Sequence, residues 1–266
     1  MRIGCQIGIW KEGDLAEKIR GIGATGVQGV ETFTTQLKPY HDDPGRFTSL
    51  LEEARLLLSG AYFNSKDFVD PAAEEAVVAE AAADCAFLAA VGGHFLVVNG
   101  GPWVGDEKRA FSDEEFAQLA RVLNRIAEAA AEHGVGAVMH PHLKCMVETP
   151  ADVDRLLAAG LSQERMGLCV HASHQLHIGA DPYAIYEKHG AWVRYAHVGD
   201  ADASNKGALL GEGVLDQKRL MQPLLDAGFD GWIIIECGKE GVSPHEYTRH
   251  ATTYLTTTWP AVAWQI

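Results

Sequence analysis

The sequence lacks the features that mark several common classes of protein. No stretch approaches 18 apolar residues without a charge or a glycine, so a transmembrane span is not expected. The first ten residues, MRIGCQIGIW, hold no long apolar core and no A-x-A cleavage site, unlike a signal peptide. No G-x-G-x-x-G pattern follows the first apolar run, which disfavours a dinucleotide-binding fold. Together these absences lead us to expect a cytoplasmic protein.

Positive charge and paired cysteines are also scarce. Lys and Arg number 22 against 36 Asp and Glu, giving a net charge of −14. An acidic chain without a basic stripe argues against nucleic acid or an anionic membrane as a partner. The five cysteines are odd in number and form no C-x-x-C pair, so we expect reduced, mostly buried thiols. Cys145, Cys169 and Cys237 lie near the candidate site, where small core fillers are favoured over soft metal ligands.

What the chain does contain is a regular alternation of apolar runs and amphipathic segments. The eight runs that we read as strands are Arg2–Ile9, Val27–Phe33, Leu58–Phe63, His94–Val98, Ala137–His142, Met166–His171, Val193–Val198 and Gly231–Glu236. The helical patterns between and after them cover Leu15–Ile22, Arg46–Leu58, Pro71–Val91, Ser112–His133, Thr149–Leu157, Asp181–His189, Asp216–Ala227 and Ser243–Thr257. We interpret Thr34–Pro44 and Asp200–Gly213 as polar loops.

Such alternation predicts a parallel sheet. About eight βα units in ~250 residues is the size of a closed (β/α)₈ TIM barrel. With no linker or shift in composition, we expect residues 1–266 to form a single domain of this α/β class. A doubly wound open sheet is the alternative, although it usually has fewer strands.

Polar side chains gather where the predicted strands end. The run AVMHPH places His140 and His142 two residues apart, and alternate side chains of a strand share a face. Three later runs end in the same kind of residue: GLCVHASH (Gly167–His174), VRYAHVGD (Val193–Asp200) and WIIIECG (Trp232–Gly238). In a barrel the chemistry lies at the carboxyl ends of the strands, where the βα loops meet.

The complete set of polar residues at these ends is Glu31, Asn64, Asn99, His140, His142, His171, His174, His197, Asp200 and Glu236. Any one of them alone is explained by ordinary hydrogen bonding in the core. A set spread over so many strands is better satisfied by a shared metal ion or a substrate with many hydroxyls. Imidazole with carboxylate suits one Mn²⁺, Fe²⁺, Co²⁺, Ni²⁺ or Zn²⁺ ion better than Mg²⁺.

At these strand ends the chain resembles the xylose isomerase-like barrel family of sugar isomerases, epimerases and dehydratases. The residues that carry the resemblance are His140-Pro141-His142, His171-Ala172-Ser173-His174, His197-Val198-Gly199-Asp200, Glu236 and the loop LLGEGVLD (Leu209–Asp216). The His-Pro-His motif is closest to inosose dehydratase-like members. The resemblance implies that His140, His171, His197 and Glu236 hold the metal, with His142 and His174 near the substrate.

The same resemblance implies proton removal next to a metal-chelated ketone, through an enediolate. Where other members carry a strand-five glutamate this chain has His140, which favours dehydration or another β-elimination, from a keto-inositol, keto-sugar or keto-glycoside. His142 or His174 is then the base, and Glu236 a ligand and second acid or base. Alternatives are a sugar isomerase or 3-epimerase, and a sugar-binding barrel without turnover. Metal-assisted phosphodiester cleavage is disfavoured by the acidic charge.

The remaining candidates would contact a small polyhydroxylated substrate. Glu31, Asn64, Asn99 and Asp200 are expected to hydrogen-bond its hydroxyls. Trp10 and Trp103 are expected to supply an apolar wall, with simple packing as an equally good explanation. Members of the family often form dimers or tetramers, so a homo-oligomer is compatible with the resemblance.

Overall fold

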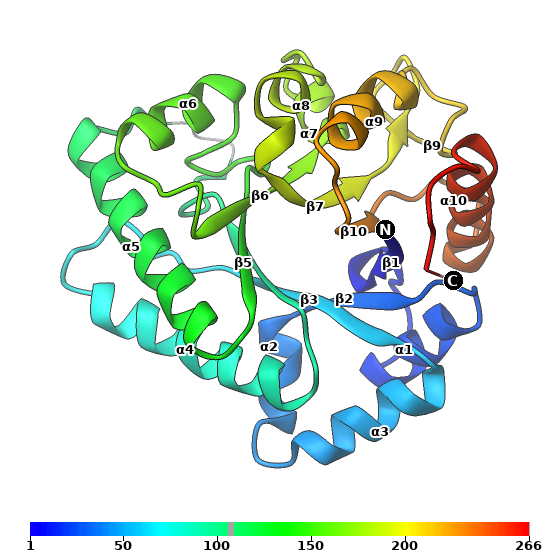
Figure 1. Cartoon of the computed structure of the whole chain (residues 1–266), viewed down its shortest axis with the longest axis horizontal. Helices are drawn as coiled ribbons and strands as arrows, with labels where there is room; N and C mark the ends of the chain where they lie inside the picture. The colour runs from blue at the N-terminus through cyan, green and yellow to red at the C-terminus, as the bar shows by residue number, and fades with distance from the viewer. Residues whose placement is uncertain (106–108, 266) are drawn as a thin grey trace.

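The computed structural model describes residues 1–105 and 109–265, and its centre is a closed barrel of parallel strands (Figure 1). Around the barrel the strands follow the order β1-β10-β7-β6-β5-β4-β3-β2. Their bounds are β1 Arg2–Gln6, β2 Gly29–Phe33, β3 Leu57–Phe63, β4 Phe95–Asn99, β5 Gly136–His140, β6 Met166–His171, β7 Val193–Val198 and β10 Trp232–Ile235. The chain is thus a (β/α)₈ TIM barrel, as predicted, and not an open sheet.

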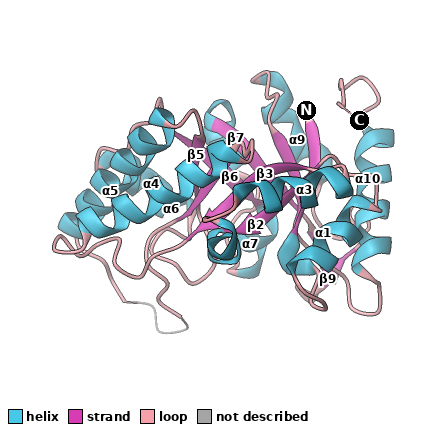
Figure 2. Cartoon of the chain, turned by 90° about the horizontal axis from the view of Figure 1, so that it is seen from below, coloured by secondary structure: helices cyan, strands magenta, loops and turns pink. Residues whose placement is uncertain are grey.

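Helices surround the barrel on the outside (Figures 1 and 2). They are α1 Leu15–Gly23, α2 Thr34–Leu37, α3 Pro44–Ala54, α4 Glu74–Ala90, α5 Asp113–Glu132, α6 Pro150–Ala158, α7 Ala172–His177, α8 Ala184–His189, α9 Gln217–Asp226 and α10 Pro244–Thr258. Reciprocal capping boxes begin four of the longer helices, with Asp14, Ser112, Thr149 and Ser243 as N-caps. These local signals explain why the sequence predicted most helix starts closely.

Two apolar layers hold the barrel together. Six buried side chains fill its interior below the carboxyl ends of the strands: Val97, Val138, Cys169, Tyr195, Trp232 and Ile234. A larger layer lies between the strands and the helices. Gly29 is required by this packing, because a Cβ there would approach the Trp232 ring to 2.5 Å. The interior is therefore solid below the rim where the candidate site residues lie.

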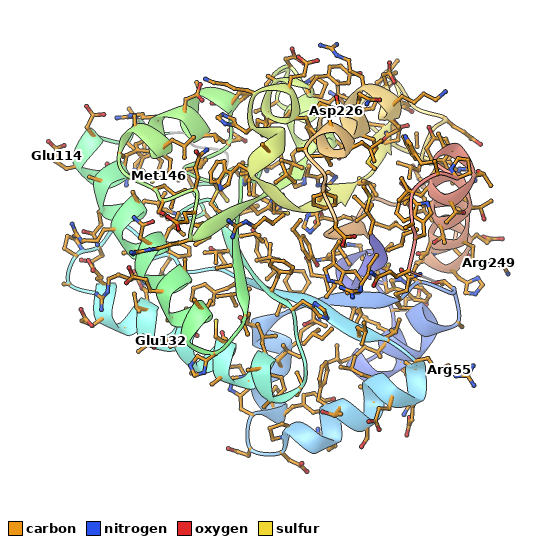
Figure 3. All side chains as sticks on the ribbon, in the orientation of Figure 1. Arg55, Glu114, Glu132, Met146, Asp226 and Arg249 are labelled. Carbon is orange, nitrogen blue, oxygen red and sulfur yellow. The ribbon has the colours of Figure 1, made fainter. Side chains whose placement is uncertain are left out.

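Charged side chains extend outward from the helices, as Glu114, Glu132, Asp226 and Arg249 do in Figure 3. Among the described residues no helix combines the length and apolar character that a membrane crossing would need. Four of the five cysteines are buried, Cys237 is half-buried, and all five are free thiols, in line with the expectation from the sequence.

Several predicted boundaries were wrong. The first strand stops at Gln6 instead of Ile9, because the Gln6 side chain accepts the Gly8 N–H and Ile7–Ile9 turns into a 3₁₀ helix. The helix predicted over Arg46–Leu58 ends at Ala54, where Arg55 adopts a left-handed conformation (φ 57°). The fifth strand ends at His140, so Pro141 and His142 begin a loop.

Elements also occur in segments where none was predicted. The expected loop Thr34–Pro44 contains α2 and a 3₁₀ turn, Lys38–Tyr40. The expected loop Asp200–Gly213 contains a two-stranded antiparallel sheet, β8 Asp200–Ala201 and β9 Gly207–Ala208. Helix α7 follows β6 immediately and carries His174.

Candidate metal centre

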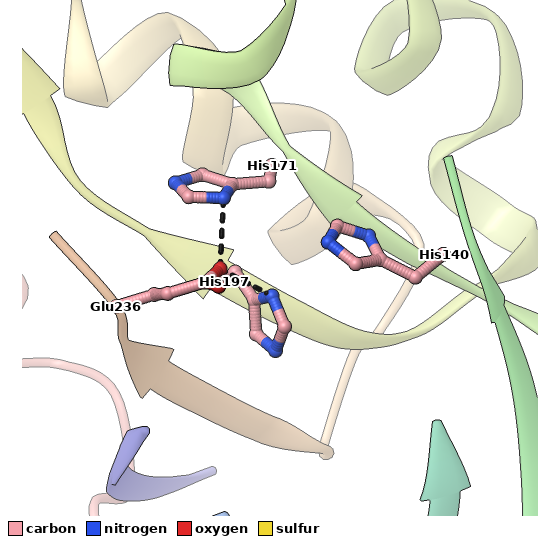
Figure 4. A group of neighbouring side chains, drawn as sticks. All are labelled: His140, His171, His197 and Glu236. Atoms are coloured by element: carbon pink, nitrogen blue, oxygen red, sulfur yellow. Dashed lines mark ion pairs between the residues drawn. The ribbon is translucent and has the colours of Figure 1, made fainter. Parts of the chain in front are cut away.

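Four predicted ligands lie at the carboxyl ends of four neighbouring strands, β5, β6, β7 and β10. His171 of β6 pairs with His197 of β7, and His140 of β5 lies opposite Asn99 of β4. Glu236 follows β10 directly, and its N–H donates to the Val198 carbonyl, 3.1 Å away, extending the ladder by one bond. Figure 4 shows the Glu236 carboxylate between the His171 and His197 rings, with His140 beside them.

One donor atom from each of these residues faces a common centre. Nε2 of His140, Nδ1 of His171, Nδ1 of His197 and Oε2 of Glu236 are buried, and one donor atom from each of the four residues lies within 4.8 Å of the others. Glu236 Oε2 lies 2.9 Å from Nδ1 of His171 and 2.7 Å from Nδ1 of His197. Apart from these ion-pair contacts the four atoms have no hydrogen-bond partner. Buried polar atoms rarely remain so, which makes the group a candidate for a bound cation.

The opposite nitrogen of each imidazole is held by another part of the protein. Nδ1 of His140 lies 3.3 Å from the Cys169 carbonyl oxygen. Nε2 of His171 lies 2.6 Å from the Ser173 hydroxyl. Nε2 of His197 lies 2.8 Å from Glu31 Oε2. Such contacts fix ring orientation and leave the other nitrogen free to ligate, as in known metal sites. Three imidazoles and one carboxylate thus fit a divalent transition metal.

The electrostatics of the cluster depend on Glu236. Burial opposes charging of His171, but Glu236 and Cys237 raise the pKa of His171 to about 9. Burial likewise opposes charging of His197, yet Cys169, Glu236 and Glu31 hold the pKa of His197 well above its usual value. Burial would raise the pKa of Glu236, but His197 and His171 keep it well below its ordinary range. Without a metal, a carboxylate therefore lies between two protonated imidazoles.

A pH dependence of metal binding follows. Below pH of about 9 the Nδ1 of His171 carries a proton that a metal must displace. We expect affinity to fall about tenfold per pH unit for each displaced proton as the pH is lowered, with the contribution of His171 levelling off above about 9. Titration calorimetry at neutral pH in two buffers of different ionisation enthalpy measures this release directly. Heats that do not depend on the buffer would contradict the assignment of His171.

Glu31 lies behind His197 and not in an open pocket. It is fully buried, and its Oε2 contacts Nε2 of His197 on the side away from Glu236. In this position Glu31 would orient the His197 ring, and its contact with substrate hydroxyls stays a prediction. The signal for this role, a carboxylate at the end of the second strand, was visible in the sequence, but its partner was not.

This geometry gives a second prediction. Glu31→Gln keeps the side-chain shape but removes the anion that holds the His197 ring, so metal affinity is expected to fall about 10–100-fold. Competition titration against a chelator measures the change. Glu132→Gln, on the exposed end of α5, is the matched control and keeps the wild-type affinity. An unchanged affinity for Glu31→Gln would show that the ring needs no anchor.

His142 and His174 lie on the open side of the cluster. Their ring centroids are 4.5 Å apart, and the His174 ring is 4.0 Å from that of His171. Donor atoms of His140, His142 and His174 also lie within 4.8 Å of one another. Burial keeps the pKa of His174 well below its usual value and lowers that of His142 as well. Both imidazoles are therefore neutral and able to accept a proton.

A pocket of about 350 Å³ opens beside the cluster. It is lined by Gln6, Gly8, Ile9, Lys11, Phe33, Tyr62, Asn64, Trp103, His142 and Glu236. Trp103 is 52% exposed, and its ring centroid is 5.9 Å from that of His142, which places it at the mouth. Trp10 lies outside this pocket, in the wall of a neighbouring cavity. Tyr62 and Lys11 were not singled out from the sequence.

Two predicted substrate contacts are engaged in internal hydrogen bonds. The Asn99 side chain accepts from Tyr62 at 2.6 Å and donates to Asn64 at 3.1 Å, so it positions residues of the pocket. Both carboxylate oxygens of Asp200 accept backbone N–H groups, from Ala201, Gly211, Gly213 and Leu215. Asp200 thereby shapes the loop after β7, although it also borders a smaller pocket next to His174.

Known proteins resemble the chain over almost its whole length. Inosose dehydratase of Lacticaseibacillus casei is 27% identical over 277 residues, covering 93% of this chain and 91% of the relative. Inosose dehydratase of Bacillus licheniformis is 28% identical, covering 92% of each. These relatives indicate an enzyme, a lyase or a sugar isomerase or epimerase.

Solved structures share the fold. The IOLI protein, whose structure holds a zinc atom, superposes with a TM-score of 0.77 at 15% identity, covering 99% of this chain and all of that one (100%). D-psicose 3-epimerase of Clostridium cellulolyticum gives a TM-score of 0.78 at 15% identity, covering 97% and 98%. The family model described as xylose isomerase-like TIM barrel matches residues 17–258. The chain belongs to the xylose isomerase-like TIM barrel family.

Proposed function

We propose that this enzyme is a divalent-metal-dependent lyase that eliminates water or another β-leaving group from a keto-inositol or keto-sugar. The observation that carries the proposal is the pairing of a four-residue metal centre with two neutral imidazoles, His142 and His174, on its open side. The full-length resemblance to inosose dehydratases supports the same reaction.

Different residues of the chain have different roles in the proposed reaction. His140, His171, His197 and Glu236 would hold the metal, which when bound supplies a Lewis acid that polarises the ketone. His174 or His142 takes the proton from the carbon next to the ketone, since both rings are held neutral by burial. Asn64 and Trp103 line the pocket that orients the sugar ring. Of the metals, Mn²⁺, Fe²⁺, Co²⁺, Ni²⁺ or Zn²⁺ suits this donor set better than Mg²⁺.

Isomerisation or 3-epimerisation of a ketose is the second candidate. One observation favours it: Glu236 borders the pocket with 19% of its side chain exposed, and His142 borders the same pocket. A carboxylate and an imidazole at separate places on the pocket wall can serve two faces of one carbon. The arrangement has a single carboxylate in the cluster, however, so a symmetric pair of carboxylate bases is absent from it.

The two candidates give different products. Metal-loaded enzyme is incubated with a keto-inositol, a keto-glycoside and a ketose in D₂O, and products are followed by ultraviolet absorbance and NMR. We expect an enone with loss of the β-substituent, and no product with His197→Ala. Epimers without an enone would overturn elimination in favour of epimerisation. No reaction with any of the three substrates would reject both.

A further inference from the structure

A second, larger cavity adjoins the pocket at the metal centre. Its volume is about 720 Å³, against about 350 Å³ for the pocket that contains Glu236. The two cavities share Ile9 and Lys11 as lining residues, and Gly238, two residues after Glu236, lines the larger one. Small-molecule sites span about 300–1,000 Å³, so the metal pocket is at the lower end of this range and the neighbouring cavity is well inside it.

The wall of the larger cavity is suited to a flat apolar group. It lies between the loop after β1, helix α1 and the start of α10, and Trp10, Val242, Pro244 and Tyr247 contribute to it. Trp10 is fixed against α1, because a Cβ on Gly21 would come within 2.5 Å of its ring. Rigid aromatic and apolar surfaces of this kind bind rings with little loss of side-chain entropy.

The charges at this cavity differ in sign from the rest of the molecule. Although the chain carries a net charge of −14, three lysines line the cavity, Lys11, Lys18 and Lys239. Its two carboxylates are Glu12 and Glu17, and Glu17 is engaged at the start of α1, where it accepts the Asp14 N–H at 2.9 Å. The cavity therefore favours a neutral or anionic occupant over a cationic one.

We propose that this cavity is a subsite for the second half of the substrate, and that the substrate is a conjugate: a keto-sugar or keto-inositol ring linked to a flat, apolar, neutral or acidic group. The ring occupies the pocket beside Glu236, and the linked group passes Ile9 and Lys11 to lie against Trp10 and Pro244. This inference rests on the proposed function, because it takes the metal pocket as the place of the sugar ring. A free keto-inositol would leave the larger cavity to water.

Binding of a glycoside that is not a ketone tests the subsite without turnover. The probes are 4-nitrophenyl β-D-glucopyranoside and methyl β-D-glucopyranoside, titrated calorimetrically into the metal-loaded protein. Burial of the aryl ring is expected to make the first bind at least about tenfold more tightly than the second. Equal affinities would overturn the proposal.

A matched pair of variants locates the effect. A Cβ on Gly238 meets no atom within 4 Å, so this position accepts a side chain, and Gly238→Phe is expected to fill part of the cavity and abolish the aryl preference. The control is Gly45→Phe, in the exposed first turn of α3, where a Cβ meets only Asp43, at 3.5 Å. This variant is expected to keep the aryl preference. The measured quantity is the ratio of the affinities for the 4-nitrophenyl and the methyl glucoside. A general loss of folded protein does not change that ratio. A ratio that Gly238→Phe leaves unchanged would place the aryl group elsewhere.

The lysines give a second readout. 4-carboxyphenyl β-D-glucopyranoside is expected to bind more tightly than its 4-nitrophenyl analogue at low salt. Lys239→Glu is expected to reverse that order, whereas Lys218→Glu, on the exposed side of α9, is expected to keep it. If the order survives Lys239→Glu, the subsite does not select for charge and that part of the proposal is wrong. Failure of the proposed function would look different: no keto-substrate would give an enone, while the aryl preference and its loss in Gly238→Phe would remain.

Discussion

Replacing Glu236 with glutamine is expected to remove tight metal binding and, with it, turnover. Glu236 supplies the one carboxylate of the four-residue cluster, and its Oε2 lies within 2.9 Å of Nδ1 of both His171 and His197. An amide has no charge to offset that of a divalent cation. Substituting a residue that only hydrogen-bonds to a metal ligand lowers metal affinity by about 10–100-fold. Loss of the ligand itself should therefore lower it by more than about a hundredfold.

Metal content after dialysis and a chelator competition measure the loss, and enone formation measures turnover. Glu240→Gln changes the same residue type four positions along, on an exposed loop, and is expected to bind metal as the wild type does. Unfolding of both variants in the metal-free state shows whether the fold is intact. If Glu236→Gln retains one tightly bound metal per chain, the cluster is not the metal centre.

The meeting of four candidate ligands was predictable because the barrel imposes it. The pattern in the sequence is four apolar runs that end in His140, His171, His197 and Glu236. A parallel barrel places all such ends at one rim. Neither the distances between the residues nor the choice of nitrogen could be predicted in this way. Those depend on contacts such as Ser173 with His171, which single-residue patterns do not encode.

Other roles could not be predicted because they depend on long-range contacts. Glu31 and His197 are 166 positions apart, and only closure of the barrel brings β2 and β7 to the same interior. Asp200 looked like a substrate ligand because it follows the seventh strand, but the path of the next 15 residues wraps backbone amides around it. Helix α7 has six residues and no side-chain N-cap, so no local pattern in the sequence predicts it.

The larger cavity also depends on contacts between distant parts of the chain. Its wall combines residues 9–18 with residues 238–247, which meet because β1 pairs with β10 when the barrel closes. Trp10 was expected to line the sugar pocket, and the shift of its ring to the neighbouring cavity follows from the 3₁₀ turn after Gln6. A turn of three residues thereby decides which cavity Trp10 lines.

His174→Gln is expected to lower kcat by about 10²–10⁴-fold while metal binding and KM change little. The half-buried His174 ring lies beside His171, its buried Nδ1 has no hydrogen-bond partner, and desolvation keeps its pKa well below the usual value. It is therefore neutral at physiological pH, as a base must be, and kcat should not fall with decreasing pH until well below 6.5. Glutamine fills similar space but cannot accept the proton.

His142→Gln and His133→Gln separate this role from the alternatives. His142 lines the sugar pocket next to Trp103, so its replacement should raise KM more than it lowers kcat if His174 is the base. His133 is exposed at the C-cap of α5 and serves as the control. Exchange of substrate protons with D₂O reports the base directly, because it requires proton removal but not elimination. Exchange that persists in His174→Gln and stops in His142→Gln would assign the base to His142, on the loop that follows β5.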